Sequence, residues 1–492
     1  MQKKSNIQRI NFKIVIRIIG MLLCMEALFM IIPYLVALWY GDGDALAFGI
    51  TTGITAAAGM LILLITRNCP THLAKREGFL VVATTWVFFS LFGMLPYLIY
   101  GCVSDITHAF FEAISGFTTT GSTLLPDIDS LPHGILFWRA FSQWLGGMGI
   151  ILFTLAILPM LNSGGGMQLF KAETTGITHS KLSPRIGQTA IRLWGMYVAI
   201  TLVLAVFLYF GPMDVFDSIC HALSTTATGG YSTKQQSIAY WNSAYIDYVI
   251  IFFMYLSGIN FPLVFLVLSK GQVKSLYRDE EVRWYTIISL LATLAIATGL
   301  FMTNQIQGSP EGTVRASLFQ VMACITSTGF STANFNSWGA FYIVILFLVM
   351  FFGACAGSTS GGAKTIRFVV LMKNTVNELY RHIHPNAVVP VRINRKIIPY
   401  EIVSKTLAFI FVYLMIFIVS SVLLAGMGLP FEEAFGYSLS CLSNLGLEFG
   451  QMTAGFAGIP DAGLWLLAFV MLVGRLELFT ILILFTPYFW KK

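Results

Sequence analysis

The segment FEAISGFTTTGST, residues 111–123, sets the architecture of this chain, because three related segments follow it. Each of the four begins with Phe and a polar residue, continues through a short apolar stretch and ends in a turn that contains glycine. The three later turns are TTATGG (225–230), TSTG (326–329) and SNLG (443–446). Recurrence at a roughly fixed spacing indicates structural repeats, so the sequence predicts four related units.

The turn glycines give the spacing of these units. Positions 121, 229, 329 and 446 lie 108, 100 and 117 residues apart. The second turn contains two adjacent glycines, Gly229 and Gly230, and either one could be the equivalent of Gly121. The fourth turn, which ends at Gly446, departs furthest from the Thr-x-Thr-Gly pattern.

Composition places the chain in a membrane. Of its 492 residues, 56% are hydrophobic and 11% are charged, whereas soluble domains carry about 25% charged residues. About 20 apolar residues cross a bilayer as a helix, and a backbone in lipid must satisfy its polar groups internally. We therefore expect an all-α polytopic membrane protein with ten transmembrane helices. The ten apolar runs are 12–40, 45–66, 79–101, 133–161, 187–211, 240–269, 282–304, 338–372, 401–427 and 460–488.

The short apolar stretch before each turn is a candidate pore helix. It has about 10–15 residues, too few to span the bilayer, and it lies between two crossing helices. Two crossings per unit give all four units the same orientation, whereas inverted repeats need an odd number. Four such units around one axis make a single pore. The expected divisions are 1–77 for two extra N-terminal helices, then repeats with pore loops at 78–175, 176–280, 281–395 (with an intramembrane gating loop) and 396–492.

Charge is distributed unevenly between the two sides of the expected membrane. Lysines and arginines, including Arg17, Arg67 and Lys274, gather in alternate loops, while the opposite loops carry acids such as Asp127. The positive-inside rule then places both termini in the cytoplasm. The net charge of +7 therefore indicates orientation and not nucleic acid binding.

The turns have the composition of a site for a dehydrated cation. Rings of backbone carbonyls replace hydration water in potassium filters, and glycine allows the backbone to aim carbonyls inward. Each pore helix would direct its C-terminal dipole, about half a negative charge, at the pore centre. The candidate cation ligands are Thr119, Thr120, Gly121, Thr228, Gly229, Gly230, Thr328, Gly329, Asn444, Leu445 and Gly446.

A glycine-rich stretch interrupts the eighth apolar run. Each glycine costs about 1 kcal/mol relative to alanine in a helix, and a broken helix within a membrane must line a cavity. Arg475 lies inside the tenth run, where an isolated charge costs at least about 2.5 kcal/mol. We predict a mobile gate that Arg475 holds across the pore; alternatively, Arg475 pairs with an acid such as Glu477. The gate candidates are Gly353, Gly357, Ser358, Gly361, Gly362, Lys364 and Arg475.

With these motifs the chain resembles the Trk/Ktr/HKT superfamily of cation transporters, and within it the TrkH type, over nearly its whole length. The motifs are GFTTTGST (116–123), FWRAFSQWLGGMGI (137–150), STTATGGYST (224–233), ITSTGFSTANF (325–335), GACAGSTSGGAKT (353–365), SNLG (443–446) and VGRLELF (473–479).

The resemblance implies several further properties. They are a bacterial inner-membrane location, a parallel homodimer with one pore per protomer, and preference for potassium where all four filters contain glycine. It also implies that a loop and an arginine form the gate, and that a cytosolic nucleotide-binding ring subunit of the TrkA type docks on the cytoplasmic face. The basic loop 373–400 is long enough to be the docking surface; alternatively, it is a plain positive-inside loop.

Three functional hypotheses are consistent with a membrane protein of this composition. The first is potassium uptake through a channel-like pore with a selectivity filter, and the alternative is a cation symporter coupled to H⁺ or Na⁺. The pore segments contain almost no acidic residues, which favours the first. A membrane enzyme is the third possibility, but no intramembrane Ser/His or His/Asp cluster supports it. We expect no cofactor, with K⁺ as the transported ion.

Overall fold

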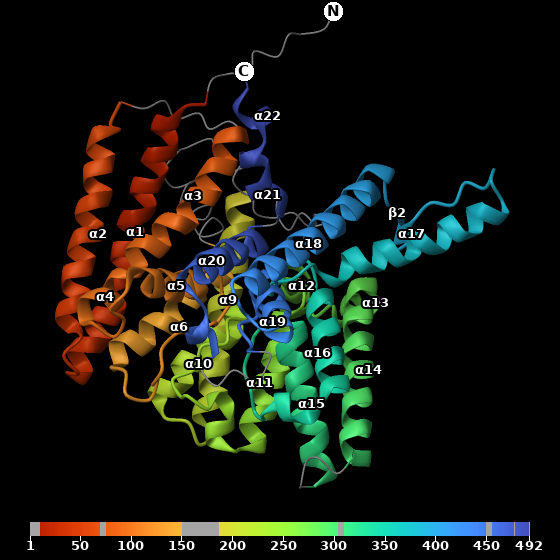
Figure 1. Ribbon diagram of the computed structural model, residues 1–492, viewed down its shortest axis with the longest axis horizontal. Helices are drawn as coiled ribbons and strands as arrows, with labels where there is room; N and C mark the ends of the chain where they lie inside the picture. Colours follow the sequence, from red (N-terminus) through yellow and green to blue (C-terminus); the bar gives the residue numbers. More distant parts are fainter. Residues whose placement is uncertain are drawn as a thin grey trace, which may run out of the picture.

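The computed structural model describes residues 10–68, 75–149, 186–303, 309–448, 455–476 and 478–491, and most of this part of the chain is helical (Figure 1). Its only strands are β1 (Arg392–Ile393) and β2 (Lys396–Ile397), which pair as a short antiparallel hairpin. The expectation of a helical protein with several long apolar helices is therefore confirmed.

Two long helices, α1 (Phe12–Tyr40) and α2 (Ala45–Ile65), begin the chain and stand side by side at one edge of the molecule (Figure 1). They cross closely because small residues meet between them. A Cβ atom on Gly59 would stand 2.7 Å from Cys24 Sγ. This pair precedes the first of the four related segments, as the sequence predicts.

Twenty-two further elements follow in the described residues. They are α3 (Lys75–Gly93), α4 (Leu95–Tyr100), α5 (Ile106–Phe117), α6 (His133–Gly147), α9 (Ile186–Tyr209), α10 (Val215–Ala227), η2 (Ser237–Trp241), α11 (Ala244–Ser257), α12 (Phe261–Lys270), α13 (Val273–Arg278), α14 (Glu280–Thr303), α15 (Pro310–Ile325), η3 (Phe335–Trp338), α16 (Ala340–Phe352), α17 (Thr365–Ile383), α18 (Tyr400–Gly426), α19 (Phe431–Leu442), η4 (Gly455–Gly458), α20 (Asp461–Arg475), α21 (Leu478–Leu482), η5 (Ile483–Phe485) and α22 (Pro487–Trp490).

Six helices are long and apolar enough to cross a membrane, and up to eight spans result if each of two bent pairs counts as one; both numbers refer to the described residues. The apolar run expected over 133–161 begins with α6, and the part of this run beyond residue 149 lies outside the described residues. The expected boundary between the first two repeats, at 175–176, also lies outside them. The six spans are Phe12–Tyr40, Ala45–Ile65, Arg76–Tyr100, Ile191–Tyr209, Glu280–Thr303 and Tyr400–Gly426.

Two of the apolar runs are not single straight helices, which corrects the sequence prediction. Within 240–269, α11 and α12 meet at 106°. The break has a local cause: the Asn260 side chain accepts a hydrogen bond from Leu263 N at 3.3 Å and starts a new helix. Within 460–488, α20 and the α21–η5 stretch meet at 115°.

The run over 338–372 is interrupted where the glycines predict. Helix α16 ends at Phe352 and α17 begins at Thr365. Between them Gly353, Gly357 and Gly362 have φ of 62°, 77° and 75°, which excludes a continuous helix. We call residues 353–364 the intramembrane loop.

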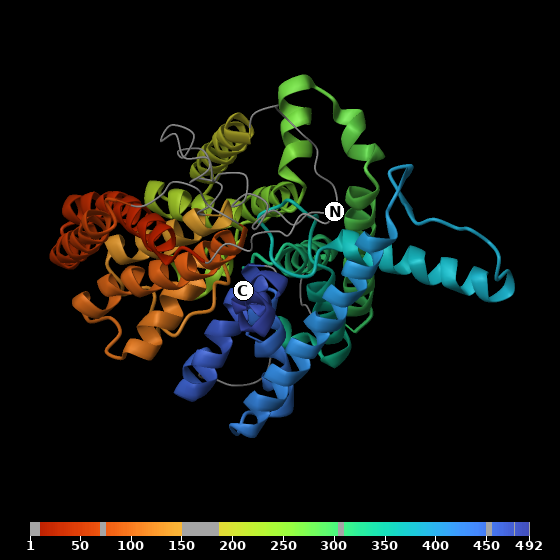
Figure 2. The same cartoon turned by 90° about the horizontal axis from the view of Figure 1, so that it is seen from above.

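The stretch 373–400 is not a plain loop, which is a second correction. Helix α17 continues to Ile383 and the β1–β2 hairpin follows, and together they project from the body as an arm (Figure 2). The helix forms because apolar residues recur at helical spacing, a pattern that the basic residues of this stretch obscured. The exposed apolar residues of this arm include Met372, Val376, Leu379 and Ile383.

Candidate functional site

Four segments share one backbone conformation. We number them segment 1 (118–121), segment 2 (227–230), segment 3 (326–329) and segment 4 (443–446). In each, the second and fourth residues have positive φ, near 54° and 80° respectively, and the fourth is glycine. The residues and their φ values are Thr119 (54°) and Gly121 (84°), Thr228 (55°) and Gly230 (83°), Ser327 (52°) and Gly329 (80°), and Asn444 (54°) and Gly446 (76°).

Backbone hydrogen bonds give the same register for the four segments. In every segment the amide of the third residue donates to the carbonyl five residues earlier, at 2.9 Å. The four bonds are Thr120 N to Ser115 O, Gly229 N to Ser224 O, Thr328 N to Ala323 O and Leu445 N to Ser440 O. Gly230, and not Gly229, is therefore the structural equivalent of Gly121. The equivalent glycine of segment 2 therefore lies one residue later in the chain than the spacing counted from Gly229.

The four segments close into a ring. A Cβ atom placed on the glycine of any segment would overlap the carbonyl oxygen of the third residue in the next segment. The glycine of segment 4 meets segment 1 in the same way, so the contacts form a closed circle. Such an approach leaves no room for a side chain, and the positive φ also favours glycine. The overlaps would be Gly121 with Gly229 O, Gly230 with Thr328 O, Gly329 with Leu445 O, and Gly446 with Thr120 O.

A short helix leads into each segment. Helices α5, α10, α15 and α19 have 12, 13, 16 and 12 residues, and each ends at or immediately before its segment. The C-terminal end of a helix carries about half a negative charge. Four such ends beside one ring create a region that favours a cation.

Hydroxyl groups support the ring from behind. Thr118 Oγ1 and Thr120 Oγ1 lie 2.8 Å apart in segment 1, and Thr326 Oγ1 and Thr328 Oγ1 lie 2.8 Å apart in segment 3. Segment 4 joins segment 1 through Asn444, whose Nδ2 donates to Thr120 Oγ1 at 3.0 Å. Side-chain hydrogen bonds therefore tie residues of segments 1 and 3 together within each segment, and join segment 4 to segment 1.

A buried ion pair that our sequence analysis missed lies beside segment 1. Arg139 Nε donates to Glu112 Oε1 at 2.9 Å, and both side chains are almost completely buried. Arg139 also donates to Ser232 O at 3.3 Å, just after segment 2. A charged residue within each of two apolar stretches is a signal that could have identified the pair.

The intramembrane loop lies directly against the ring. Gly361 N donates to Ser327 Oγ in segment 3 at 2.6 Å, and Thr359 Oγ1 donates to Thr226 O, next to segment 2, at 3.1 Å. A Cβ atom on Gly361 would overlap Ser443 O in segment 4. The loop thus contacts three of the four segments or their immediate neighbours.

The other gate candidates lie along the same loop. Gly353 and Gly362 approach one another, since a Cβ atom on Gly362 would stand 3.3 Å from Gly353 Cα. Gly357 lies against the start of α12, and Ser358 Oγ donates to Cys355 O at 2.6 Å within the loop. Gly361 is the candidate whose backbone reaches the ring, at Ser327 Oγ.

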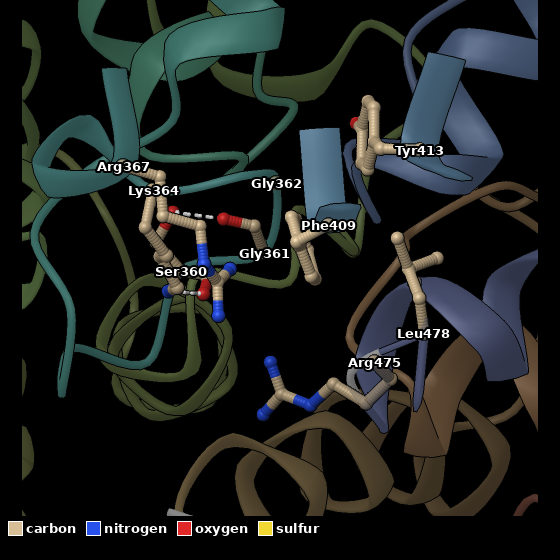
Figure 3. Close-up of a pocket in the computed structure, with 10 residues that line it drawn as sticks. Ser360, Gly361, Gly362, Lys364, Arg367, Phe409, Tyr413, Arg475 and Leu478 are labelled. Carbon is tan, nitrogen blue, oxygen red and sulfur yellow. Dashed lines mark hydrogen bonds between the residues drawn. The ribbon is translucent and has the colours of Figure 1, made fainter. Parts of the chain in front are cut away.

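Arg475 joins the loop to α6. Its guanidinium donates to Thr359 O at 2.8 Å, to Gly146 O at 2.6 Å and to Gly147 O at 3.0 Å. Figure 3 shows this side chain reaching toward the loop across a small cavity of about 40 Å³. On the opposite side of the cavity, Lys364 donates to Ser360 O. Arg475 therefore holds the loop from outside, while Lys364 bonds within the loop itself.

An acidic turn connects the arm with the loop. Glu280 accepts hydrogen bonds from Lys373 in α17 and, at 3.1 Å, from Asn394 N in the hairpin. The next residue, Glu281, is buried and accepts from Ala356 N in the loop at 2.6 Å. Two adjacent carboxylates at the start of α14 therefore contact the arm and the loop respectively.

Comparison with known proteins identifies the relatives of this chain. A family model described as "TrkH: Cation transport protein" matches residues 47–492. The Trk system potassium uptake protein TrkH of Escherichia coli K12 is 40% identical over 484 residues, which is 98% of this chain and 100% of that protein. TrkH of Halomonas elongata is 38% identical, with 98% of this chain and all of that protein covered. These relatives are transport proteins and not enzymes, which agrees with the sequence analysis.

A solved structure has the same fold. The crystal structure of the potassium transporter TrkH from Vibrio parahaemolyticus superposes with a TM-score of 0.89 at 36% sequence identity, and the match covers 98% of this chain and 100% of that chain. The resemblance seen in the motifs is therefore confirmed over nearly the whole length.

Proposed function

Because this chain belongs to the TrkH family of cation transport proteins, we propose that it carries potassium ions into the cell across a bacterial inner membrane. The ion passes through a channel-like pore whose selectivity filter is the ring of segments 1–4. The named relatives are potassium uptake proteins, and their function agrees with the geometry of the ring.

The closed ring of backbone is the observation that carries this proposal. Potassium filters replace hydration water with rings of carbonyl oxygens, and here each of four segments brings the same carbonyl next to the glycine of its neighbour. The filter glycines are Gly121, Gly230, Gly329 and Gly446. The ends of four short helices add negative potential where the ion loses its water.

The proposed architecture contains four repeats of helix, pore helix and helix around this ring, after two N-terminal helices, with ten transmembrane helices in total. The repeated helix–segment unit supports it, as does the position of both ends of the described chain at the same end of the molecule (Figure 1). An even number of crossings with basic loops inside places the termini in the cytoplasm.

The intramembrane loop is the proposed gate. In this arrangement it contacts the ring through Gly361 and Thr359, and Arg475 connects it to α6. A loop rich in glycine can change its backbone conformation at low cost. Opening would break the Arg475–Thr359 hydrogen bond and move the loop away from the ring.

We propose two protein partners, both of which rest on the family resemblance. A second copy of the chain would form a parallel homodimer, and a cytosolic nucleotide-binding ring subunit of the TrkA type would dock on the arm. The acidic turn at Glu280 and Glu281 gives such a partner a physical connection to the gate. Size-exclusion chromatography with light scattering measures the first interaction, and co-purification with the ring subunit measures the second.

Ion flux in proteoliposomes tests the function. We expect rubidium or potassium uptake that exceeds sodium uptake, that follows the electrochemical gradient of the ion and that continues without a proton or sodium gradient. Uptake that requires either of those gradients would favour the cation symporter. Equal flux of sodium and potassium would contradict the filter.

A further inference from the structure

Segment 2 differs from the other three segments at its third position. The third position holds Thr120, Thr328 and Leu445 in segments 1, 3 and 4 but Gly229 in segment 2. The first position of segment 2 is Ala227, so this segment cannot form the pair of threonine hydroxyls found in segments 1 and 3. A side chain from outside the segment, on α6, instead donates a hydrogen bond to its third carbonyl.

Backbone conformation does not explain the glycine at 229. Its φ is not in the left-handed region, and the equivalent residues of the other three segments all carry a side chain. A Cβ atom on Gly229 would instead collide with the side chain of Gln143, whose Nε2 would stand 2.9 Å away with Cδ and Oε1 closer still. The space of the absent side chain is thus filled by a residue of α6, in the preceding unit.

Gln143 makes three hydrogen bonds around segment 2. Its Oε1 accepts from Tyr231 N at 3.1 Å and from Ser224 Oγ at 2.7 Å, and its Nε2 donates to Gly229 O at 2.7 Å. The Tyr231 amide can only donate, so it fixes which end of the Gln143 amide is oxygen. The side chain is completely buried, and its polar atoms are paired as burial requires.

We infer that Gln143 is a positioning residue that determines ion specificity by acting as the missing side chain of segment 2. This inference rests on the proposed function, in which the ring is the potassium filter. Gln143 fixes the direction of the Gly229 carbonyl, which approaches Gly121 in the ring. Because a potassium filter discriminates through carbonyl oxygens that replace the hydration shell of the ion, a carbonyl that turns freely would discriminate less well.

A pair of reciprocal substitutions tests this inference. Gln143→Ala empties the space behind segment 2, and Gly229→Thr places the threonine of segments 1 and 3 into it. The single variant Gly229→Thr should lose uptake, because its Cβ atom collides with Gln143. Gln143→Ala should still conduct, but its potassium-to-sodium uptake ratio should fall about tenfold, the factor that one buried hydrogen bond can contribute. The double variant should regain uptake relative to Gly229→Thr and selectivity relative to Gln143→Ala.

Gln143→Glu provides a second variant if the alanine protein does not fold. A carboxylate keeps the acceptor for Ser224 and Tyr231 but loses the donor to Gly229 O, so its uptake ratio should also fall. Gln272→Ala, on an exposed loop, controls for preparation and should keep the wild-type ratio. The wild type and all five variants are compared by thermal unfolding, because a purely structural role would lower stability without changing the ratio.

The outcomes separate this inference from the proposed function. A wild-type protein without potassium-selective uptake would overturn both. If the wild type selects potassium while Gln143→Ala or Gln143→Glu keeps its uptake ratio, the role of Gln143 is refuted and the filter stands. A double variant no better than Gly229→Thr would also refute it, since the side chain would then not be interchangeable with Gln143.

Discussion

Replacing Arg475 by alanine tests how the gate is held closed. Arg475 connects the intramembrane loop to α6, through one hydrogen bond to Thr359 O at 2.8 Å and two to α6 at Gly146 O and Gly147 O. Only the first of these reaches the loop. Loss of this bond should therefore favour loop conformations away from the ring.

The size of the effect follows from that one bond. A hydrogen bond from a charged donor contributes about 1.5–3 kcal/mol, and about 1.4 kcal/mol corresponds to a factor of ten in an equilibrium constant. Arg475→Ala should then raise the ratio of open to closed gates about 10- to 100-fold. Arg475→Lys keeps the charge but replaces the two donor nitrogens that bond the loop and α6 with a single nitrogen, so we expect an intermediate increase.

Rubidium uptake into proteoliposomes, in the absence of any regulatory subunit, measures this ratio as an initial rate. Arg192→Ala is a matched control, because Arg192 is an exposed arginine on α9. The closed-gate reasoning fails if Arg475→Ala takes up rubidium at the wild-type rate. It also fails if Arg192→Ala produces the same increase, since the effect would then follow from loss of any positive charge.

Three more substitutions address the ring, the ion pair and the acidic turn. Gly329→Ala should abolish discrimination between potassium and sodium. The φ at 329 is 80°, and a left-handed alanine costs about 1–2 kcal/mol before any overlap with the neighbouring carbonyl. Gly312→Ala, where a Cβ atom would have ordinary contacts, is the control and should leave the potassium-to-sodium flux ratio unchanged. Arg139→Leu should destabilise the protein by about 3–5 kcal/mol, since it leaves Glu112 buried without its cation; a thermal unfolding temperature in detergent equal to the wild type would contradict this. Glu281→Ala removes the acceptor of a loop amide at 2.6 Å and should raise unregulated rubidium uptake several-fold, whereas a rate at or below the wild type would show that this contact does not hold the gate.

Much of the fold could be predicted because its signals are local. Apolar runs of sufficient length predict helices that avoid water, and a run of glycines predicts a break, as between Phe352 and Thr365. Four similar turns indicated four related sites. The bends at Asn260 and beyond Arg475 were missed, because an apolar composition is the same on both sides of a bend.

The sequence did not show which of two adjacent glycines in segment 2 belongs to the ring. Gly229 and Gly230 are adjacent and identical in the sequence, and the structure distinguishes them by the hydrogen bond from Gly229 N to Ser224 O and by the φ of Gly230. The role of Gln143 was equally hidden, since it contacts Gly229 from 86 residues away. A single polar residue in an apolar helix carries no indication of which carbonyl it will meet.

Sequence alone therefore established that this chain folds as apolar helices with four glycine turns, since hydrophobicity and backbone freedom are properties of each residue and its neighbours. Packing in three dimensions established which glycines form the ring, which carbonyls they meet and which side chains hold the loop. These contacts join residues up to several hundred positions apart, as Asn444 with Thr120. Their geometry depends on how all the helices fit together at once.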